Sequence, residues 1–355
     1  MLSRGASSVL TGAAVKNVLK FVLGLVLAGA LLWWFFRGVE LESVAHAVAE
    51  ARWEWLGACL AMTLLHYVVR AWRWRLLLAP LKRRIPIRLL VEGVLAGYAV
   101  SFILPGRLGE LVRPALVARR ERLSMTGTLA TVGVDRLLDG ATLTVFLVIF
   151  LILAPGTTNG IPTEVTSGMR LWGFLVGGGM AIILVVLSIA ALYRRHLPAQ
   201  RLDGSWRDRA LGMLRSGLEA LSALHGVRPL AGAILGSLLI WLVLATQAWT
   251  GMRAFGIDLP FAFSFGLIAA LAVGIATPTP AGAGGFHAAG GAFLILVYGV
   301  NESLAVAAIL VLHLFSVVPS VILGGVVLAR EGVSLGELAG HRTPAIKQAA
   351  AEGQL

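Results

Sequence analysis

SFILPGRLGELVRPALVARR, residues 101–120, follows the mostly apolar run LLVEGVLAGYAV of residues 89–100. Pro105 and Gly106 stand where a membrane-spanning helix would finish, and Arg107 comes directly after them. Irregular backbone at membrane depth is tolerated only where protein or a water-filled cavity surrounds it. This stretch therefore predicts a re-entrant helical hairpin, which enters the membrane and turns back near Pro105.

The composition of the chain is that of a polytopic membrane protein. Of its 355 residues, 58% are hydrophobic and only 14% are charged, and the mean hydropathy is +0.85. A soluble domain of this size would expose large apolar patches, which excludes that class. The single cysteine, Cys59, excludes a disulfide within the chain and a thiolate metal site.

The net charge of +12 does not indicate nucleic acid. The basic residues stand between apolar segments, so they fit loops that set membrane orientation and that meet anionic lipid headgroups. We therefore expect the membrane bilayer, and no nucleic acid, as the partner of this charge.

Six apolar segments have the roughly 17–25 residues that a helix needs to cross a bilayer. The first of them is similar to a signal peptide, but it is long and ends in Trp33, Trp34 and Arg37, so we expect an uncleaved helix. The predicted fold is all-α: about six transmembrane helices plus two re-entrant helical hairpins, in one domain over residues 1–330. The full spans are 18–36, 55–71, 126–153, 171–193, 230–250 and 302–328, and three shorter pieces are 88–104, 261–276 and 286–299.

Lysine and arginine residues in the loops predict which side each loop faces. Residues 70–88 hold seven basic residues and no acid, so we expect an amphipathic helix on the cytoplasmic surface. The arginine-rich residues 194–228 are predicted to be a cytoplasmic loop, whereas the acidic residues 37–54 face outside. The N-terminus and the tail over 331–355 are then cytoplasmic, and the protein is placed in the cell (inner) membrane.

These orientations make the two hairpins enter the membrane from opposite sides. The hairpin around Pro105 begins and ends in the cytoplasm, and the one over 258–300, with TPTPAGAGG (277–285) in its middle, begins and ends outside. Two interrupted hydrophobic pieces in corresponding positions of two halves predict an inverted repeat with a transport site near the membrane midplane. The alternative is a chance pair of loops between ordinary helices.

The first hairpin carries a candidate anion site. A helix that restarts at Pro114 exposes free N–H groups and the positive end of its dipole, and Arg107 and Arg113 lie beside it. Arginine holds phosphate through two parallel hydrogen bonds, so we predict a phosphate-recognising site here, with Ser101 and Glu110 as further members. The alternative is that both arginines only extend to the membrane surface.

Three charges interrupt the apolar segment 126–153. Asp135 and Asp139 share one helix face, and Arg136 can pair with Asp139. A charge at the centre of a bilayer costs roughly 2.5–3.5 kcal/mol, so these side chains must face protein or water. They are either members of a transport path and counter-ions for the hairpin arginines, or a structural ion-pair lock between helices.

The second hairpin offers Thr279 and His287 as candidate substrate-binding residues. Its glycine run lacks the lysine and the serine or threonine of a nucleotide-binding loop. The histidines at membrane depth, His66, His287 and His313, match no metal-ligand spacing, and hydrogen bonds between helices are expected of them before a proton relay. No arrangement of serine, histidine and aspartate indicates catalysis, so we predict no catalytic residue, no metal and no cofactor.

Three stretches together resemble the lysylphosphatidylglycerol synthase transmembrane family, also called the flippase-like domain family. They are GYAVSFILPGRLGELVR (97–113), TVGVDRLLD (131–139) and TPAGAGGFH (279–287). The resemblance covers about residues 15–330. It implies a multi-helix, lipid-flippase-like module with two re-entrant hairpins, which larger relatives fuse to a cytoplasmic aminoacyl-transferase domain.

The chain departs from the family pattern at Ser101, Asp135 and His287, where members often carry Asn, Glu and Glu. Because His287 is not acidic, an acidic role that the family has at this position of the second hairpin need not hold in this chain. The resemblance still implies a membrane lipid transporter, which moves an anionic phospholipid or a lipid-linked phosphate between leaflets.

The alternative function is a non-catalytic membrane partner of a separate glycosyl- or aminoacyl-transferase. Aminoacyl-phospholipid synthase activity is disfavoured, because the polar stretches 194–228 and 331–355 are too short to fold as a catalytic domain. A third possibility, a membrane-embedded enzyme, has no residue arrangement to support it.

Overall fold

The computed structural model describes residue 33 and residues 41–104, 108–153, 227–277 and 279–332. These residues form helices, with no strand among them. Three of the described helices are long and apolar enough to cross a membrane: α6 (Met125–Leu153), the segment Arg228–Ala254 of α9, and α12 (Glu302–Arg330). The all-helical prediction is confirmed, and these three helices fit a polytopic membrane protein.

The described helices follow one order twice: a long helix, two shorter helices and a second long helix. A short helix, α2 (Leu41–Ala49), precedes the first long helix, and one 3₁₀ turn, η2 (Pro280–Gly282), lies between the shorter helices of the second half. The first half is α3 (Trp53–Leu78), α4 (Ile87–Ile103), α5 (Gly109–Glu121) and α6 (Met125–Leu153); the second is α9 (Val227–Ala254), α10 (Phe263–Ile275), α11 (Gly285–Tyr298) and α12 (Glu302–Arg330).

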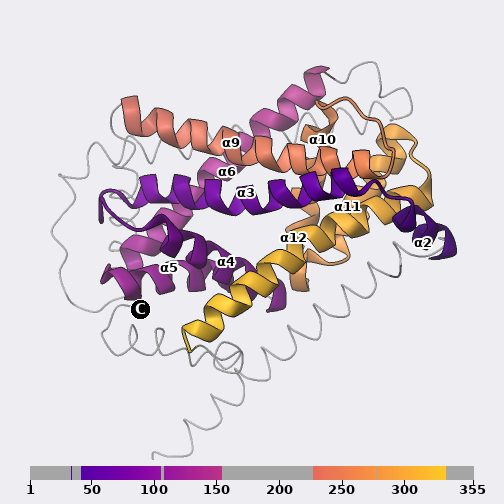
Figure 1. The fold of residues 1–355 in the computed structure, drawn as a ribbon. Coiled ribbons are helices and arrows are strands. Elements are labelled where there is room, and N and C mark those ends of the chain that lie inside the picture. Colours follow the sequence, from indigo (N-terminus) through magenta and orange to yellow (C-terminus); the bar gives the residue numbers. More distant parts are fainter. Residues whose placement is uncertain (1–32, 34–40, 105–107, 154–226, 278, 333–355) are drawn as a thin grey trace, which may run out of the picture.

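The centre of the fold is the pair of long helices α3 and α9, which run side by side (Figure 1). The backbone N–H of Arg52, just before α3, donates to the carbonyl oxygen of Ala254 at the end of α9 (2.8 Å). Toward the other end of α3, Arg73 donates to the hydroxyl of Ser237, which lies near the start of α9 (2.8 Å). The two helices are therefore antiparallel.

Each pair of shorter helices packs as a hairpin, α4 against α5 and α10 against α11. The first helix of each hairpin also packs against the last helix of the other half, so that α4 contacts α12 and α10 contacts α6. The chain enters the first hairpin from the Leu78 end of α3 and the second from the Ala254 end of α9. Because α3 and α9 are antiparallel, the two hairpins start at opposite ends of the central pair (Figure 1).

A pair of glycines lets the two arms of each hairpin approach closely. A Cβ atom added to Gly97 of α4 would lie 2.9 Å from the carbonyl oxygen of Gly109 in α5, and one added to Gly109 would overlap the carbonyl of Gly97. Gly274 of α10 and Gly285 of α11 face each other in the same way. Helix contacts this close need residues without a side chain, as in other membrane helix interfaces.

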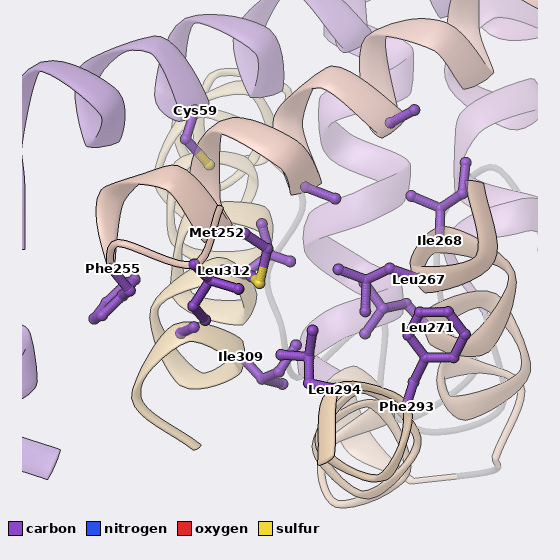
Figure 2. Packing of buried hydrophobic residues seen from close by; sticks show 14 of the residues in the cluster. Cys59, Met252, Phe255, Leu267, Ile268, Leu271, Phe293, Leu294, Ile309 and Leu312 are labelled. Atoms are coloured by element: carbon purple, nitrogen blue, oxygen red, sulfur yellow. The ribbon is translucent and has the colours of Figure 1, made fainter. Parts of the chain in front are cut away.

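The main hydrophobic core lies between the second hairpin and the long helices. Leu267 and Leu271 of α10 gather there with Phe293 and Leu294 of α11 and with Ile309 of α12, all of them buried (Figure 2). A second cluster, centred on the fully buried Trp74, Leu77 and Leu90, joins α3 to α4. Both hairpins are therefore held in place by apolar packing as well as by their loops.

Helices form where the apolar segments predicted them. The segments 55–71, 126–153, 230–250 and 302–328 correspond to α3, α6, α9 and α12, and 88–104, 261–276 and 286–299 correspond to α4, α10 and α11. The predicted span 171–193, all of the span 18–36 except residue 33, and nearly all of the loop 194–228 and of the tail 331–355 lie outside the described residues.

Two predictions need correction. The helix of the first hairpin does not restart at Pro114: α5 begins at Gly109 and Pro114 lies inside it, so the helix N-terminus is not beside Arg113.

The second of these predictions is the separate amphipathic helix at the start of residues 70–88. Residues 70–78 instead continue α3 without a break. Arg70, Arg73 and Trp74 are buried, whereas Trp72 is exposed. The arginines leave the surface because carboxylates on α6 neutralise them, and a count of local charge does not detect partners on another helix.

Candidate functional site

A cavity of about 570 Å³ lies where the two hairpins meet the long helices. Both hairpins contribute residues near their tips, such as Ser101 from α4 and Thr279 and Gly282 from the second hairpin. The volume is in the range of ligand-binding sites. The other lining residues come from α3 (Thr63, His66, Tyr67, Arg70), α4 and α5 (Val94, Gly97, Tyr98, Phe102, Gly109, Glu110, Arg113), α6 (Arg136), α9 (Trp241, Leu244, Gln247, Ala248), α10 and the tip after it (Ile268, Leu271, Ala272, Ile275, Ala276, Thr277, Ala281), α11 (Phe286) and α12 (Leu312, Ser316).

The lining of the cavity has a charged part and an apolar part. Arg70, Arg113 and Arg136 contribute guanidinium groups to the charged part, and they belong to one connected ion-pair network. α10 supplies only apolar side chains, including Leu271 and Ile275. Such a cavity suits an amphiphile that has an anionic group at one end.

Asp135 of α6 is the centre of the network. Its Oδ1 atom accepts hydrogen bonds from Nε (3.0 Å) and Nη2 (2.7 Å) of Arg73. Its Oδ2 atom accepts from Nη1 of Arg113 (3.0 Å) and, more weakly, from Nη1 of Arg70 (3.4 Å). The carboxylate is fully buried, so it ties α3 and α5 to α6 in a place that water does not reach.

Asp139 lies one helical turn further along α6 and shares two of these arginines with Asp135. It accepts from Arg70 (2.8 Å) and Arg73 (2.7 Å) of α3, and from Arg136 of its own helix (3.2 Å). The predicted pair of Arg136 and Asp139 is therefore present, and Arg136 also pairs with Glu110 of α5 (3.2 Å).

The network has more positive than negative charge. Four arginines (Arg70, Arg73, Arg113, Arg136) share three carboxylates (Glu110, Asp135, Asp139) in the part of the chain that the structure describes. Asp135 and Asp139 lie behind the arginines and do not line the cavity. They serve as counter-ions for the arginines and as a lock between helices at once, and three of the four arginines line the cavity.

The tip of the second hairpin has irregular backbone that two histidines hold. Ala281 and Gly284 have left-handed backbone, with φ of 56° and 81°. The N–H of Gly284 donates to Nδ1 of His287 (3.4 Å), and His313 Nε2 bonds to the carbonyl oxygen of Ala281 (3.1 Å). Their rings meet edge to face, with centroids 4.6 Å apart. His313 bonds to another element, as expected, whereas the bond of His287 is to the N-cap residue of its own helix, α11.

The structure brings together most of the predicted site residues. Ser101, Glu110, Arg113, Arg136 and Thr279 line the cavity. His287 is buried beside the second tip but is not part of the cavity wall. Arg107 lies outside the described residues.

Sequence reasoning missed Arg70 and Arg73 as site residues. The available signal was that Arg70 and Arg73 are three residues apart and so share one helix face. Asp135 and Asp139, four residues apart on another apolar segment, share a face in the same way. Trp241 of α9 was missed as well, since a single tryptophan in an apolar helix carries no signal of its own. Among the described residues, no group of three or more histidine, cysteine or acidic side chains could hold a metal ion.

Comparison with known proteins gives a family match over most of the chain. A family model described as the lysylphosphatidylglycerol synthase TM region matches residues 21–324. Glycosyltransferase AglD of Haloferax volcanii is 25% identical over 319 residues, which cover 81% of this chain and 50% of that protein. The UPF0104 membrane protein PH1989 of Pyrococcus horikoshii is 23% identical over 341 residues, which cover 89% of this chain and 97% of that protein.

Proposed function

This chain belongs to the lysylphosphatidylglycerol synthase transmembrane family, and we propose that it is a lipid transporter. In this proposal it moves an anionic phospholipid or a lipid-linked phosphate between the two leaflets of the cell (inner) membrane. The observation that carries the proposal is the cavity, whose charged part and apolar part match the two ends of such a lipid.

The binding residues in this proposal are those of the charged part of the lining and of the two hairpin tips. Arg113 and Arg136 supply positive charge, and Ser101, Glu110 and Thr279 supply hydrogen-bonding groups around it. Arg107, which follows Gly106 in the sequence, is a predicted further contact. Asp135 and Asp139 keep the arginines in place, so that the charge is available without reorganisation when the ligand arrives.

The proposed membrane arrangement is an inverted repeat with two re-entrant hairpins and cytoplasmic termini. The hairpin helices have 17, 13, 13 and 14 residues, and a 13-residue helix is only about 20 Å long, against about 30 Å of hydrocarbon. The antiparallel pair of α3 and α9 also supports it, since equivalent helices of an inverted repeat must run in opposite directions.

A second candidate function is that of a non-catalytic membrane partner for a transferase. The relative named glycosyltransferase AglD supports it, because this chain spans about half the length of that relative. Under this reading the cavity presents a lipid-linked phosphate to a separate enzyme and does not carry it across the membrane.

The test of transport is to fill the cavity. Ala272 of α10 lines the cavity, whereas its neighbour Val273 has 71% of its surface exposed and does not line it. In vesicles with fluorescent phosphatidylglycerol, Ala272→Trp should reduce the rate of lipid movement to that of protein-free vesicles. Val273→Trp, the matched control, should leave the rate near that of the wild type.

Equal rates for both tryptophan variants and the wild type would contradict transport through this cavity. If the wild type moves no lipid at all, while Ala272→Trp still impairs lipid-linked glycosyl transfer by a partner enzyme in native membranes, the partner function is the better one.

A further inference from the structure

We infer that Arg113 and Trp241 together hold the phosphate group of the ligand, an inference that rests on the proposed function of the cavity. The proposal concerns the indole N–H of Trp241 and two atoms of Arg113, Nε and Nη2. These two atoms have no hydrogen-bond acceptor among the described residues, and we call them the open edge of Arg113. Each of these donors is buried and belongs to a residue that lines the cavity.

The guanidinium group of Arg113 is fixed on two sides. Its Nη1 atom donates to Asp135 Oδ2 (3.0 Å), and its Cζ atom lies 3.9 Å from the centre of the Trp74 ring. Trp74 is itself fully buried and donates to Thr131 Oγ1 (2.9 Å). The plane and the direction of the guanidinium are therefore set before any ligand binds.

The open edge of Arg113 has no acceptor among the described residues, although only 4% of this residue is exposed. A buried charged group without hydrogen bonds is costly, so such a group indicates a missing partner. Arg73 shows what this edge binds, because its own Nε and Nη2 atoms both donate to the carboxylate of Asp135 (3.0 and 2.7 Å). The same edge of Arg113 is ready for a second anion with oxygens close together.

Trp241 provides an independent second donor. Only 8% of it is exposed, and its Nε1 atom meets no acceptor in the part of the chain that the structure describes. Ser237, one turn earlier on α9, binds Arg73 (2.8 Å). In this antiparallel pair of helices Trp241 therefore lies about level with Arg70, beside the ion network.

The donors specify the chemistry of the ligand. The open edge of Arg113 can donate to two oxygen atoms that are bonded to the same atom, and the indole N–H can donate to a third acceptor. A single tetrahedral phosphate group supplies all three oxygens. The positive excess of the network favours an anion over a zwitterion. We assign the phosphate to a lipid headgroup, because α10 lines the same cavity with apolar side chains only.

The experiment measures binding of dihexanoylphosphatidylglycerol to the purified full-length protein in detergent by calorimetry. Arg113→Lys keeps the positive charge but loses the two-donor edge, so affinity should fall by about tenfold to a hundredfold. Trp241→Phe removes one neutral donor and should lower affinity by about threefold to tenfold. Dihexanoylglycerol, which has no phosphate, should bind neither the wild type nor the variants measurably.

The protein offers matched controls. Arg253 lies over the ring of Trp249 (5.0 Å) and pairs with Asp258 (2.6 Å). It therefore has an aromatic and a carboxylate neighbour, as Arg113 has, but it is partly exposed and does not line the cavity. Arg253→Lys and Trp249→Phe should therefore bind the lipid as the wild type does. If Arg113→Lys does not fold, Trp241→Phe carries the test alone.

Wild-type affinity in both Arg113→Lys and Trp241→Phe would overturn the inference. Inorganic phosphate that displaces the lipid at equal concentration would overturn its lipid part and assign the site to free phosphate. Failure of this inference is separate from failure of the transport proposal, because the Ala272→Trp variant tests transport without changing either donor.

Discussion

At the scale of single residues, the molecule depends on charges that would be unfavourable alone. Arg73 is fully buried and binds both Asp135 and Asp139. Taking either partner out of water is expensive, and a buried ion pair is often no more stabilising than apolar residues of the same size. The network is therefore better explained by its position, since it directs the side chain of Arg113 toward the cavity.

Removal of the buried Arg73 should lower the stability of the protein more than removal of the partly exposed Arg136. Arg73→Leu leaves two buried carboxylates short of a partner, so we expect the free energy of unfolding to fall by about 3–5 kcal/mol. The side chain of Arg136 is 39% exposed, and Arg136→Leu should cost less than about 1 kcal/mol. Thermal unfolding in detergent measures both.

Equal losses for the two arginine variants would show that burial does not decide the strength of these pairs. The double variant Arg73→Leu with Asp135→Leu distinguishes a direct pair from two separate contributions. Recovery of stability in the double variant supports direct pairing, and additive losses argue against it.

At the scale of helices, the hairpin arms depend on contacts without side chains. Gly109→Ala would place a Cβ atom on the carbonyl of Gly97, so we expect a loss of about 1–3 kcal/mol and a displaced α5. Gly133 of α6 is the matched control, since a Cβ atom there meets nothing within 4 Å. Gly133→Ala should be neutral or stabilising by up to about 1 kcal/mol. Size-exclusion chromatography after heat treatment measures how much folded protein of each variant remains. Equal amounts for Gly109→Ala and Gly133→Ala would contradict a close contact between α4 and α5.

The sequence predicted helix positions well because apolar runs are local signals. The piece 88–104 became α4, over Ile87–Ile103, and 286–299 became α11, over Gly285–Tyr298. The run 55–71 was too short for α3, which continues to Leu78, because Arg70 and Arg73 look like the start of a surface segment. Their neutralisation by α6 depends on how helices pack, and no local pattern contains that information.

The candidate site was predictable in its polar half only. Ser101, Glu110 and Arg113 could be found because charge and proline in an apolar run are conspicuous. Trp241 and the apolar lining residues on α10 look like ordinary membrane helix. They become part of a site only through the packing of α9 against α3 and of α10 against α6.

At the scale of the whole molecule, the two halves make equivalent contacts. α3 and α9 pack against each other at the centre, and the contact of α4 with α12 has its counterpart in that of α10 with α6. The contacts within each half also match, from long helix to hairpin and from hairpin to the last helix. The polar groups do not match: the first half brings three arginines and Glu110 to the cavity, and the second brings uncharged polar and apolar side chains. Because the two halves have similar helix packing but different side chains, they line one cavity with a charged part and an uncharged part.

This arrangement predicts the membrane topology, and cysteine labelling measures it. In a Cys59→Ala background, single cysteines replace four exposed residues: Arg84 and Ser124, which flank the first hairpin, and Asp258 and Glu302, which flank the second. The 26 residues of α3 span about 39 Å, so the two sets lie at opposite ends of the central helix pair. An impermeant thiol reagent added to intact cells should label positions 258 and 302, and should label 84 and 124 only after the membrane is opened. Labelling of all four positions from the same side would rule out an inverted repeat and, with it, hairpins that reach the cavity from opposite faces.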